Sequence, residues 1–265
     1  MSLFRYIPLI CAFVLMLSPS QGQILTGPLV GGQATMVRYS TLYEGVDFSQ
    51  NLSPNYLGGW SYTYAVNEAL AFHSELVFSQ KGKIQHYNSS STRVIEHTTR
   101  FQFLDAPVLL RITRPFYQKK ATWFVNAGPQ LSYWLGGRGI LKTYTFFGSQ
   151  ETEDQEYKIR FSGSKTADEV IVATDANRVQ FGLAVGGGIS LPVNRQGHQI
   201  MVNVRYVMGT TQLTGNESFA VGTTDIEEYL GYRHNALQLS TAYVFPINIM
   251  GIRRGKSTHK VKHRK

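Results

Sequence analysis

Residues 70–79 read LAFHSELVFS, a stretch in which large apolar side chains recur at every second position. One face of the extended chain would carry Leu70, Phe72, Ser74, Leu76 and Phe78. The other face would carry Ala71, His73, Glu75, Val77 and Ser79. Successive side chains of a strand point to opposite faces, so the stretch predicts a β-strand with one largely apolar face and one mostly polar face.

Similar alternation recurs along the chain, with connections that are alternately short and long. The other seven strands are expected at about 29–39, 56–66, 96–112, 123–133, 179–190, 199–208 and 236–245. Short connections are expected at 66–68, 114–120 and 192–198, and long ones at 40–54, 81–94, 136–176 and 210–232. This two-sided asymmetry is typical of an all-β, eight-stranded antiparallel up-and-down transmembrane β-barrel with short periplasmic turns and long extracellular loops. A soluble β-sandwich shares the alternation, but the connection lengths favour the barrel.

The N-terminus predicts export. Residues 1–22 combine Arg5, a short apolar run over 7–17 and small residues at Ser20 and Gly22, which is the pattern of a cleaved signal peptide. The single cysteine, Cys11, lies inside this segment, so the mature chain would form no disulfide. Beyond residue 22, no stretch reaches the roughly 18–20 apolar residues that a spanning helix needs. We therefore expect residues 23–246 to form a barrel in the cell outer membrane and residues 247–265 to form a tail.

The net charge of +9 is concentrated in that tail. Seven basic residues stand there without an acid: Arg253, Arg254, Lys256, Lys260, Lys262, Arg264 and Lys265. The rest of the chain is nearly neutral, which argues against nucleic acid as a partner. The tail is expected to be either a solvated extension or an electrostatic anchor to anionic lipid headgroups or to an acidic periplasmic protein, since each basic residue near an anionic membrane contributes about 1 kcal/mol.

Four motifs carry a resemblance to a known family. They are Glu75 to Gly82 (ELVFSQKG), Phe103 to Arg111 (FLDAPVLLR), Ala127 to Tyr133 (AGPQLSY) and the glycine-rich Phe181 to Gly188. In order and spacing they resemble the PorT-type outer-membrane β-barrel proteins, small barrels of Gram-negative envelopes. The resemblance implies an eight-stranded barrel in the outer membrane. Some members serve a protein-secretion and gliding apparatus, and the resemblance transfers no such role to particular residues here.

Five charged or titratable residues are expected to point into the barrel: His73, Glu75, Asp105, Arg111 and Arg205. An unpaired ion inside a filled barrel is costly, so we expect them to form one interior salt-bridge network that closes the pore. A narrow polar conduit is the alternative. Small inward residues at Gly182, Ala184, Gly186 and Gly188 would relieve crowding in an interior of only eight strands. Pro107 and Pro129 fall within strands, where we expect β-bulges.

The sequence does not predict an enzyme. His73, Ser74 and Glu75 are adjacent, but Ser74 would point away from both neighbours, so the three cannot form a catalytic triad. No metal-ligand spacing and no phosphate-binding glycine loop are present, and no cofactor is expected. We expect a non-enzymatic envelope protein that acts through its outer loops as a binding or structural component, with outer-membrane lipid as its first partner. The alternatives are a scaffold subunit that binds periplasmic or secretion-apparatus proteins, a narrow porin, and a lipid A-modifying enzyme.

Overall fold

The barrel wall consists of eight long strands. The structure, a computed structural model, describes residues 23–39, 48–90, 93–116, 121–145, 154–161, 170–173, 176–214, 218–220 and 227–247. The wall strands are β1 (Gln23–Tyr39), β3 (Ser53–Ala65), β4 (Leu70–Ser90), β5 (Arg93–Phe116), β6 (Ala121–Thr145), β9 (Val179–Pro192), β10 (Gln199–Gly209) and β13 (Tyr232–Ile247). The predicted signal peptide and the seven basic residues of the tail lie outside the described residues.

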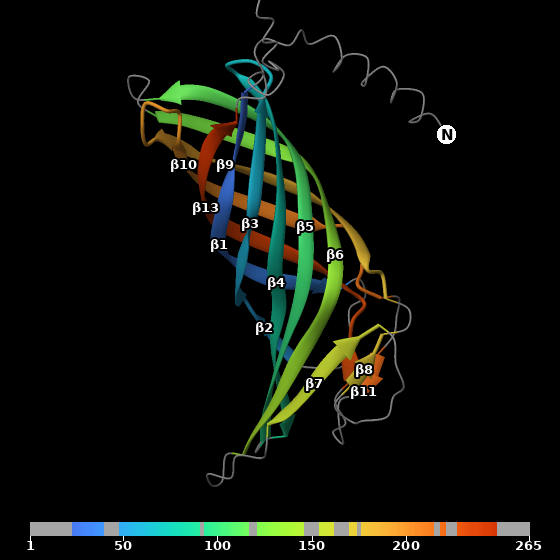
Figure 1. Ribbon diagram of the computed structural model, residues 1–265. Coiled ribbons are helices and arrows are strands. Elements are labelled where there is room, and N and C mark those ends of the chain that lie inside the picture. The colour runs from blue at the N-terminus through green and yellow to red at the C-terminus, as the bar shows by residue number, and fades with distance from the viewer. Residues whose placement is uncertain are drawn as a thin grey trace, which may run out of the picture.

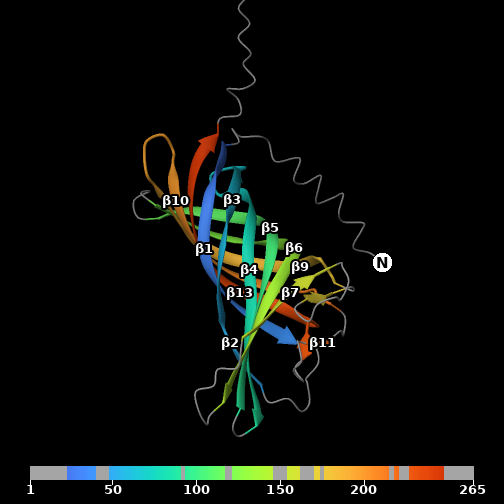
Figure 2. The ribbon, with the colours of Figure 1, turned by 60° about the horizontal axis from the view of Figure 1, so that its bottom comes forward.

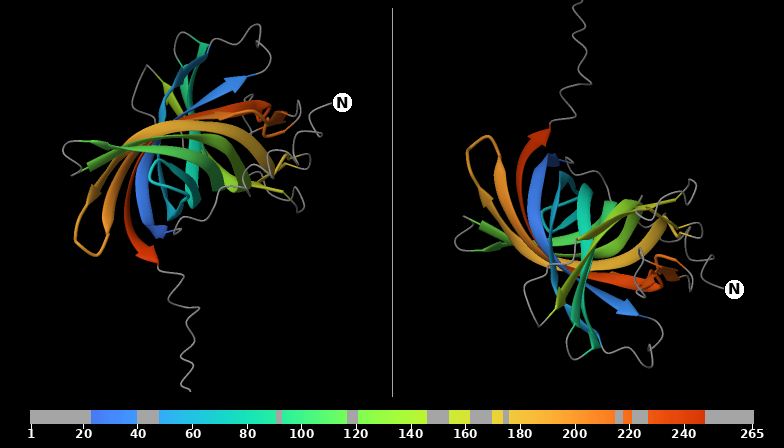
Figure 3. Two further views of the ribbon diagram at one scale, coloured as in Figure 1. Left: turned by 90° about the horizontal axis from the view of Figure 1, so that it is seen from above. Right: turned by 90° about the horizontal axis from the view of Figure 1, so that it is seen from below.

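The eight strands close into a ring. Each wall strand pairs antiparallel with the wall strand that follows it in sequence, and β1 pairs antiparallel with β13, with Val30 opposite Thr241. The strands curve around a common interior (Figures 1, 2 and 3). Closure leaves no wall strand with a free edge, which a sheet surrounded by hydrocarbon requires. The predicted eight-stranded antiparallel barrel is therefore confirmed.

The two ends of the barrel differ. At one end, near the N-terminus of β1, β3 joins β4 through residues 66–69, and β9 joins β10 through residues 193–198. At the other end β4, β5 and β6 extend well beyond the remaining wall strands (Figure 1). The long loop expected at 81–94 is wrong, because β4 continues to Ser90 and β5 begins at Arg93. Their composition there is polar, and pairing between the two strands, not hydrophobic alternation, keeps them extended.

Five shorter strands lie at the long-loop end. They are β2 (Phe48–Asn51), β7 (Gln155–Arg160), β8 (Val170–Val172), β11 (Ser218–Ala220) and β12 (Glu227–Tyr229). β7 pairs antiparallel with the outer part of β6, and β8 pairs parallel with β7. The wall thus continues beyond the barrel, at the long-loop end, as a sheet of β5, β6 and β7. The inner face of this sheet contributes Phe101, Trp134 and Tyr157 to a buried hydrophobic cluster.

One extra residue interrupts the long pairing of β5 with β6. Gln102 lies opposite Gly136, but Phe103 lies opposite Trp134, so Leu135 has no partner of its own. Gly136 has φ +148°, which L side chains rarely adopt. The pairing therefore contains a β-bulge at this point, and the alternation of β6 changes parity across it.

The bulges expected at the two strand prolines are wrong. Pro107 lies opposite Gln130, and after a gap the same register resumes with Leu110 opposite Ala127. Pro129 lies opposite Leu183 without any shift in register. A proline removes only one donor, and the local lapse in β5–β6 pairing accommodates that loss without an inserted residue.

The outer wall is apolar over the part of the strands that lies nearer the short turns. Exposed aliphatic side chains include Val30, Val108, Val185 and Leu239, and exposed aromatic side chains include Trp60, Trp123, Tyr133 and Tyr243. Between Trp123 and Tyr133, β6 rises about 33 Å along the strand, which corresponds to about 25 Å along the barrel axis at a tilt of about 40°. That height matches the hydrocarbon layer that an outer-membrane barrel spans. The described residues include no helix long and apolar enough to cross a membrane.

Candidate functional site

The interior of the barrel holds the charged residues that the sequence singles out. His73 and Glu75 on β4, Asp105 and Arg111 on β5 and Arg205 on β10 are all buried, each with at most 6% of its surface exposed. They point inward because they alternate with outward residues such as Leu76, Leu104 and Tyr206. Burial of this many charges requires partners, and the partners divide the five residues into separate groups.

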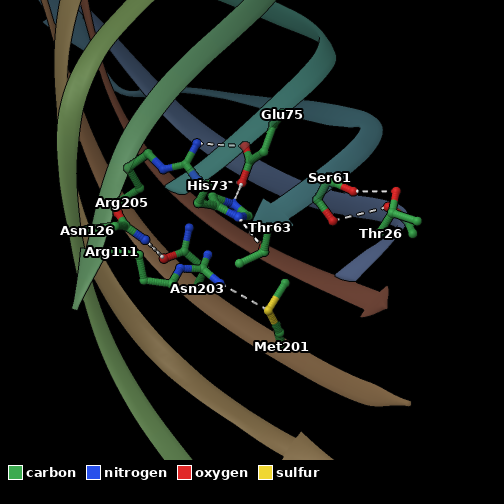
Figure 4. Close-up of polar contacts among 11 residues, drawn as sticks. Thr26, Ser61, Thr63, His73, Glu75, Arg111, Asn126, Met201, Asn203 and Arg205 are labelled. Atoms are coloured by element: carbon green, nitrogen blue, oxygen red, sulfur yellow. Dashed lines mark hydrogen bonds and ion pairs between the residues drawn. The ribbon is translucent and has the colours of Figure 1, made fainter. Parts of the chain in front are cut away.

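The first group crosses the barrel. Glu75 accepts hydrogen bonds from both terminal nitrogens of Arg205, with Nη1 2.8 Å from Oε2. In the ring order β4 and β10 stand four strands apart, on opposite walls of the barrel. The ion pair therefore spans the interior (Figure 4). A bidentate, buried pair of this kind fixes the distance between two walls that share no backbone hydrogen bond.

His73 and Thr63 extend this first group. His73 Nε2 lies 2.8 Å from Glu75 Oε1, and its Nδ1 lies 2.8 Å from the hydroxyl of Thr63 on β3. An ionised carboxylate only accepts, so Nε2 carries the proton that is donated to Glu75, and the Thr63 hydroxyl donates to Nδ1. Ser74, which the sequence places beside them, faces the other side of the strand and is not part of the group.

Arg111 lies near this group without joining it. Its guanidinium stacks on the ring of Phe124, 4.0 Å from the ring centre, and its Nη1 donates to Met201 Sδ at 3.3 Å. Among the described residues no carboxylate lies within ion-pair distance of Arg111, and its Nε has no hydrogen-bond partner. Gly188 leaves room for this stack, because a Cβ there would lie 2.8 Å from Phe124 Cζ.

Asp105 belongs to a second group nearer the long-loop end. Its Oδ1 accepts from Lys81 Nζ at 2.9 Å, and its Oδ2 accepts from the hydroxyl of Ser79 at 2.6 Å. Lys81 is 4% exposed and also lies over the ring of Phe103. The structure therefore divides the expected single network into two groups, with Arg111 outside both. Asp105 lies opposite Val77, two residues along β4 from Glu75, but its hydrogen bonds go to Ser79 and Lys81, and among the described residues none joins it to the first group.

Sequence reasoning missed both buried lysines of β4. Lys81 and Lys83 were expected in a loop, but they continue the inward series 71, 73, 75, 77 and 79. Lys83 Nζ lies 4.9 Å from the centre of the Tyr232 ring on the opposite side of the interior. Continuing the alternation of inward and outward residues beyond Ser79 would have predicted that both lysines point into the barrel. Above them, Phe101, Phe103 and His234 stack edge to face and fill the outer end of the interior.

Comparison with known proteins agrees with this architecture. A family model described as an outer membrane protein beta-barrel domain matches residues 20–215. The match ends before β13, which pairing with β1 and β10 assigns to the same barrel. No curated protein matches the sequence.

Several solved structures are similar at low identity. Neisserial surface protein A is 11% identical over 84% of this chain and 97% of that chain, with a TM-score of 0.36. Ail of Yersinia pestis, solved with a heparin analogue, is 13% identical over 84% and 99%, with a TM-score of 0.34. OprG of Pseudomonas aeruginosa is 9% identical over 86% and 97%, with a TM-score of 0.38. These TM-scores are all below 0.5, so the assignment depends on the family model and on the strand pairing.

Proposed function

The chain belongs to the outer membrane protein β-barrel domain family, and we propose that it is a non-enzymatic component of the outer membrane with a closed interior. In this proposal the barrel is a stable support, and the segments above the membrane bind a partner or contribute to envelope structure. The observation that carries the proposal is the Arg205–Glu75 pair, which joins opposite walls through the middle of the barrel. A protein built to pass solutes would not fill its path with a buried ion pair and a stack of aromatic rings.

A second observation supports a closed interior. Polar side chains at several heights reach across to strands that are not their neighbours. Gln33 on β1 donates to the backbone of Gln80 on β4 at 2.8 Å, and Lys81 on β4 donates to Ser132 on β6 at 3.3 Å. Such contacts consume the hydrogen-bonding groups that would otherwise line a water path, and they leave the outer segments as the parts free to act.

We predict that the purified barrel shows no discrete conductance steps in planar lipid bilayers. The reason is that the crossing pair and the aromatic rings block the interior at two heights. The measurement is single-channel recording after reconstitution of protein whose folding is verified by a migration shift on boiling. Stable, unitary steps from the wild-type protein would contradict the closed interior and favour the narrow porin. As a matched comparison, Arg205→Ala combined with Glu75→Ala removes the crossing side chains but keeps the aromatic rings, so this variant is also expected to show no steps.

The finer assignments are also proposals. The four motifs described above support membership of the PorT-type group, and the pattern of residues 1–22 supports export with cleavage before Gln23. A scaffold role in a secretion assembly would be favoured by periplasmic partners that co-purify with the full chain and are lost when residues 253–265 are deleted. A lipid A-modifying activity would be favoured by altered lipid A in a strain that lacks the protein.

A further inference from the structure

We propose that Arg100, Arg138 and Lys158 bind the phosphate groups of lipid headgroups in the outer leaflet of the outer membrane. These three residues, here called the basic ladder, lie on the outer wall just above the apolar band. The proposal depends on the location of the barrel in the outer membrane and is independent of whether its interior is closed.

The basic ladder is a row of direct neighbours on three adjacent strands. Arg100 on β5 lies opposite Arg138 on β6, and Arg138 lies opposite Lys158 on β7. All three side chains are exposed. Side chains directly opposite one another in a sheet have Cβ atoms about 5 Å apart, so the three Cβ atoms of the ladder lie within about 10 Å.

The charges of the ladder are not neutralised by the part of the protein that the structure describes. No carboxylate there lies within ion-pair distance of any of the three residues, whereas Lys142, further out on β6, contacts Asp154 at 3.3 Å. Glu156 shares the face of Lys158 on β7 without forming such a pair, and Arg160 on the same face offsets its charge. Like charges directly opposite each other destabilise a sheet, so this arrangement is expected to be compensated by an external anion.

The height of the ladder selects the kind of anion. Leu104 on β5 and Leu135 on β6 are the last strongly exposed leucines of the apolar band, and the ladder begins four and three residues beyond them. At about 3.3 Å per residue and a tilt of about 40°, this places it roughly 10 Å outside the band. The headgroup region extends about 5–8 Å beyond the hydrocarbon on each side, and long arginine side chains reach back toward it.

The direction and the chemistry of the ladder fit a lipid phosphate. The opposite face of this sheet packs on Phe101, Leu141 and Tyr157, so the ladder faces sideways from the barrel, toward neighbouring lipids. Guanidinium groups bind phosphate through two parallel hydrogen bonds, and a lysine adds a compact charge. Two arginines and a lysine in one row can therefore hold the phosphates of one or two headgroups against the wall.

The test compares binding of lipid A that carries its two phosphates with binding of the same lipid after dephosphorylation. Purified full-length protein in neutral detergent is titrated with each lipid, and bound copies are counted by native mass spectrometry. We expect the triple variant Arg100→Gln, Arg138→Gln, Lys158→Gln to bind the phosphorylated lipid at least about tenfold more weakly, the factor that one charge-assisted hydrogen bond supplies. The dephosphorylated lipid is expected to bind the wild type and the variant equally weakly.

The matched control is Arg114→Gln, an exposed arginine on β5 at the opposite end of the barrel. It is expected to retain the affinity of the wild type. Equal affinity of the wild type and the triple variant, or equal affinity for the two lipids, would overturn the proposal. Displacement of the lipid by inorganic phosphate at the same concentration would identify a general anion site and would also overturn it. The single variant Arg138→Gln, which loses the middle charge, provides the same comparison if the triple variant does not show the migration shift of a folded barrel.

Discussion

Replacing Arg205 by methionine is expected to lower the free energy of unfolding of the barrel by about 3–5 kcal/mol, the usual cost of leaving one partner of a buried ion pair alone. Glu75 would keep its hydrogen bond from His73 but lose both bonds from the opposite wall. The measurement is urea unfolding of the protein in lipid vesicles, followed by tryptophan fluorescence and by loss of the boiling-dependent migration shift.

Two comparisons make the Arg205 result specific. The double variant Arg205→Met, Glu75→Gln removes both charges and keeps an acceptor for His73, so it should recover most of the lost stability. Arg195→Met makes the same substitution at an exposed position in the turn between β9 and β10 and should change stability by less than about 0.5 kcal/mol. If Arg205→Met is no less stable than Arg195→Met, the two walls are not held together by this pair.

Asp105→Asn is expected to cause a loss of similar size, again about 3–5 kcal/mol, because it leaves Lys81 buried without its carboxylate. Asp154→Asn is the control, since that acid pairs with Lys142 at the surface, where both side chains are about half exposed and such pairs contribute about 0–1 kcal/mol. The same urea unfolding measures both. A loss no greater for Asp105→Asn than for Asp154→Asn would contradict the assignment of a buried pair.

The combination of Asp105→Asn with Arg205→Met distinguishes two groups from one network. Sites that share no partner have effects that add within about 0.5 kcal/mol. The Glu75–Arg205 pair and the Asp105–Lys81 pair share no hydrogen-bonding group, so we expect the losses to add. A double variant that is clearly more stable than the sum would show that the five residues form one coupled network, as the sequence alone suggested.

The sequence predicted the transmembrane part of the fold because residues that face lipid are large and apolar, whereas the residues between them, which face the interior, are small or polar. Along β9, exposed Phe181, Leu183 and Val185 alternate with Gly182, Ala184 and Gly186. This alternation predicts both the strand and which of its side chains face outward. Above the membrane that contrast disappears. Lys81 to Ser90 has the polar composition of a loop, and it is a strand because β4 pairs there with β5.

Partners inside the barrel could not be predicted in the same way. Alternation within one strand predicts which side chains point into the barrel. Two inward side chains touch only if they also lie at the same level along the barrel axis. Height depends on the register between strands, such as Val77 opposite Asp105, and no local pattern specifies it. Asp105 therefore was assigned to the correct face but to the wrong partners, and Lys81 was not assigned to the interior at all.

The bulge at Leu135 keeps the distal half of β6 paired with β5 although β6 carries one extra residue. Before the bulge, odd-numbered residues of β6 such as Tyr133 face outward. After the bulge, even-numbered residues such as Arg138 face outward. Deleting Leu135 would remove the bulge and join Trp134 to Gly136, so Arg138 would still lie opposite Arg100 and would still face outward. The extra residue therefore affects the local bend and twist of the wall and not the charge of its outer surface, and insertions or deletions at this point are a route by which related barrels can reshape their outer end without exchanging their two faces.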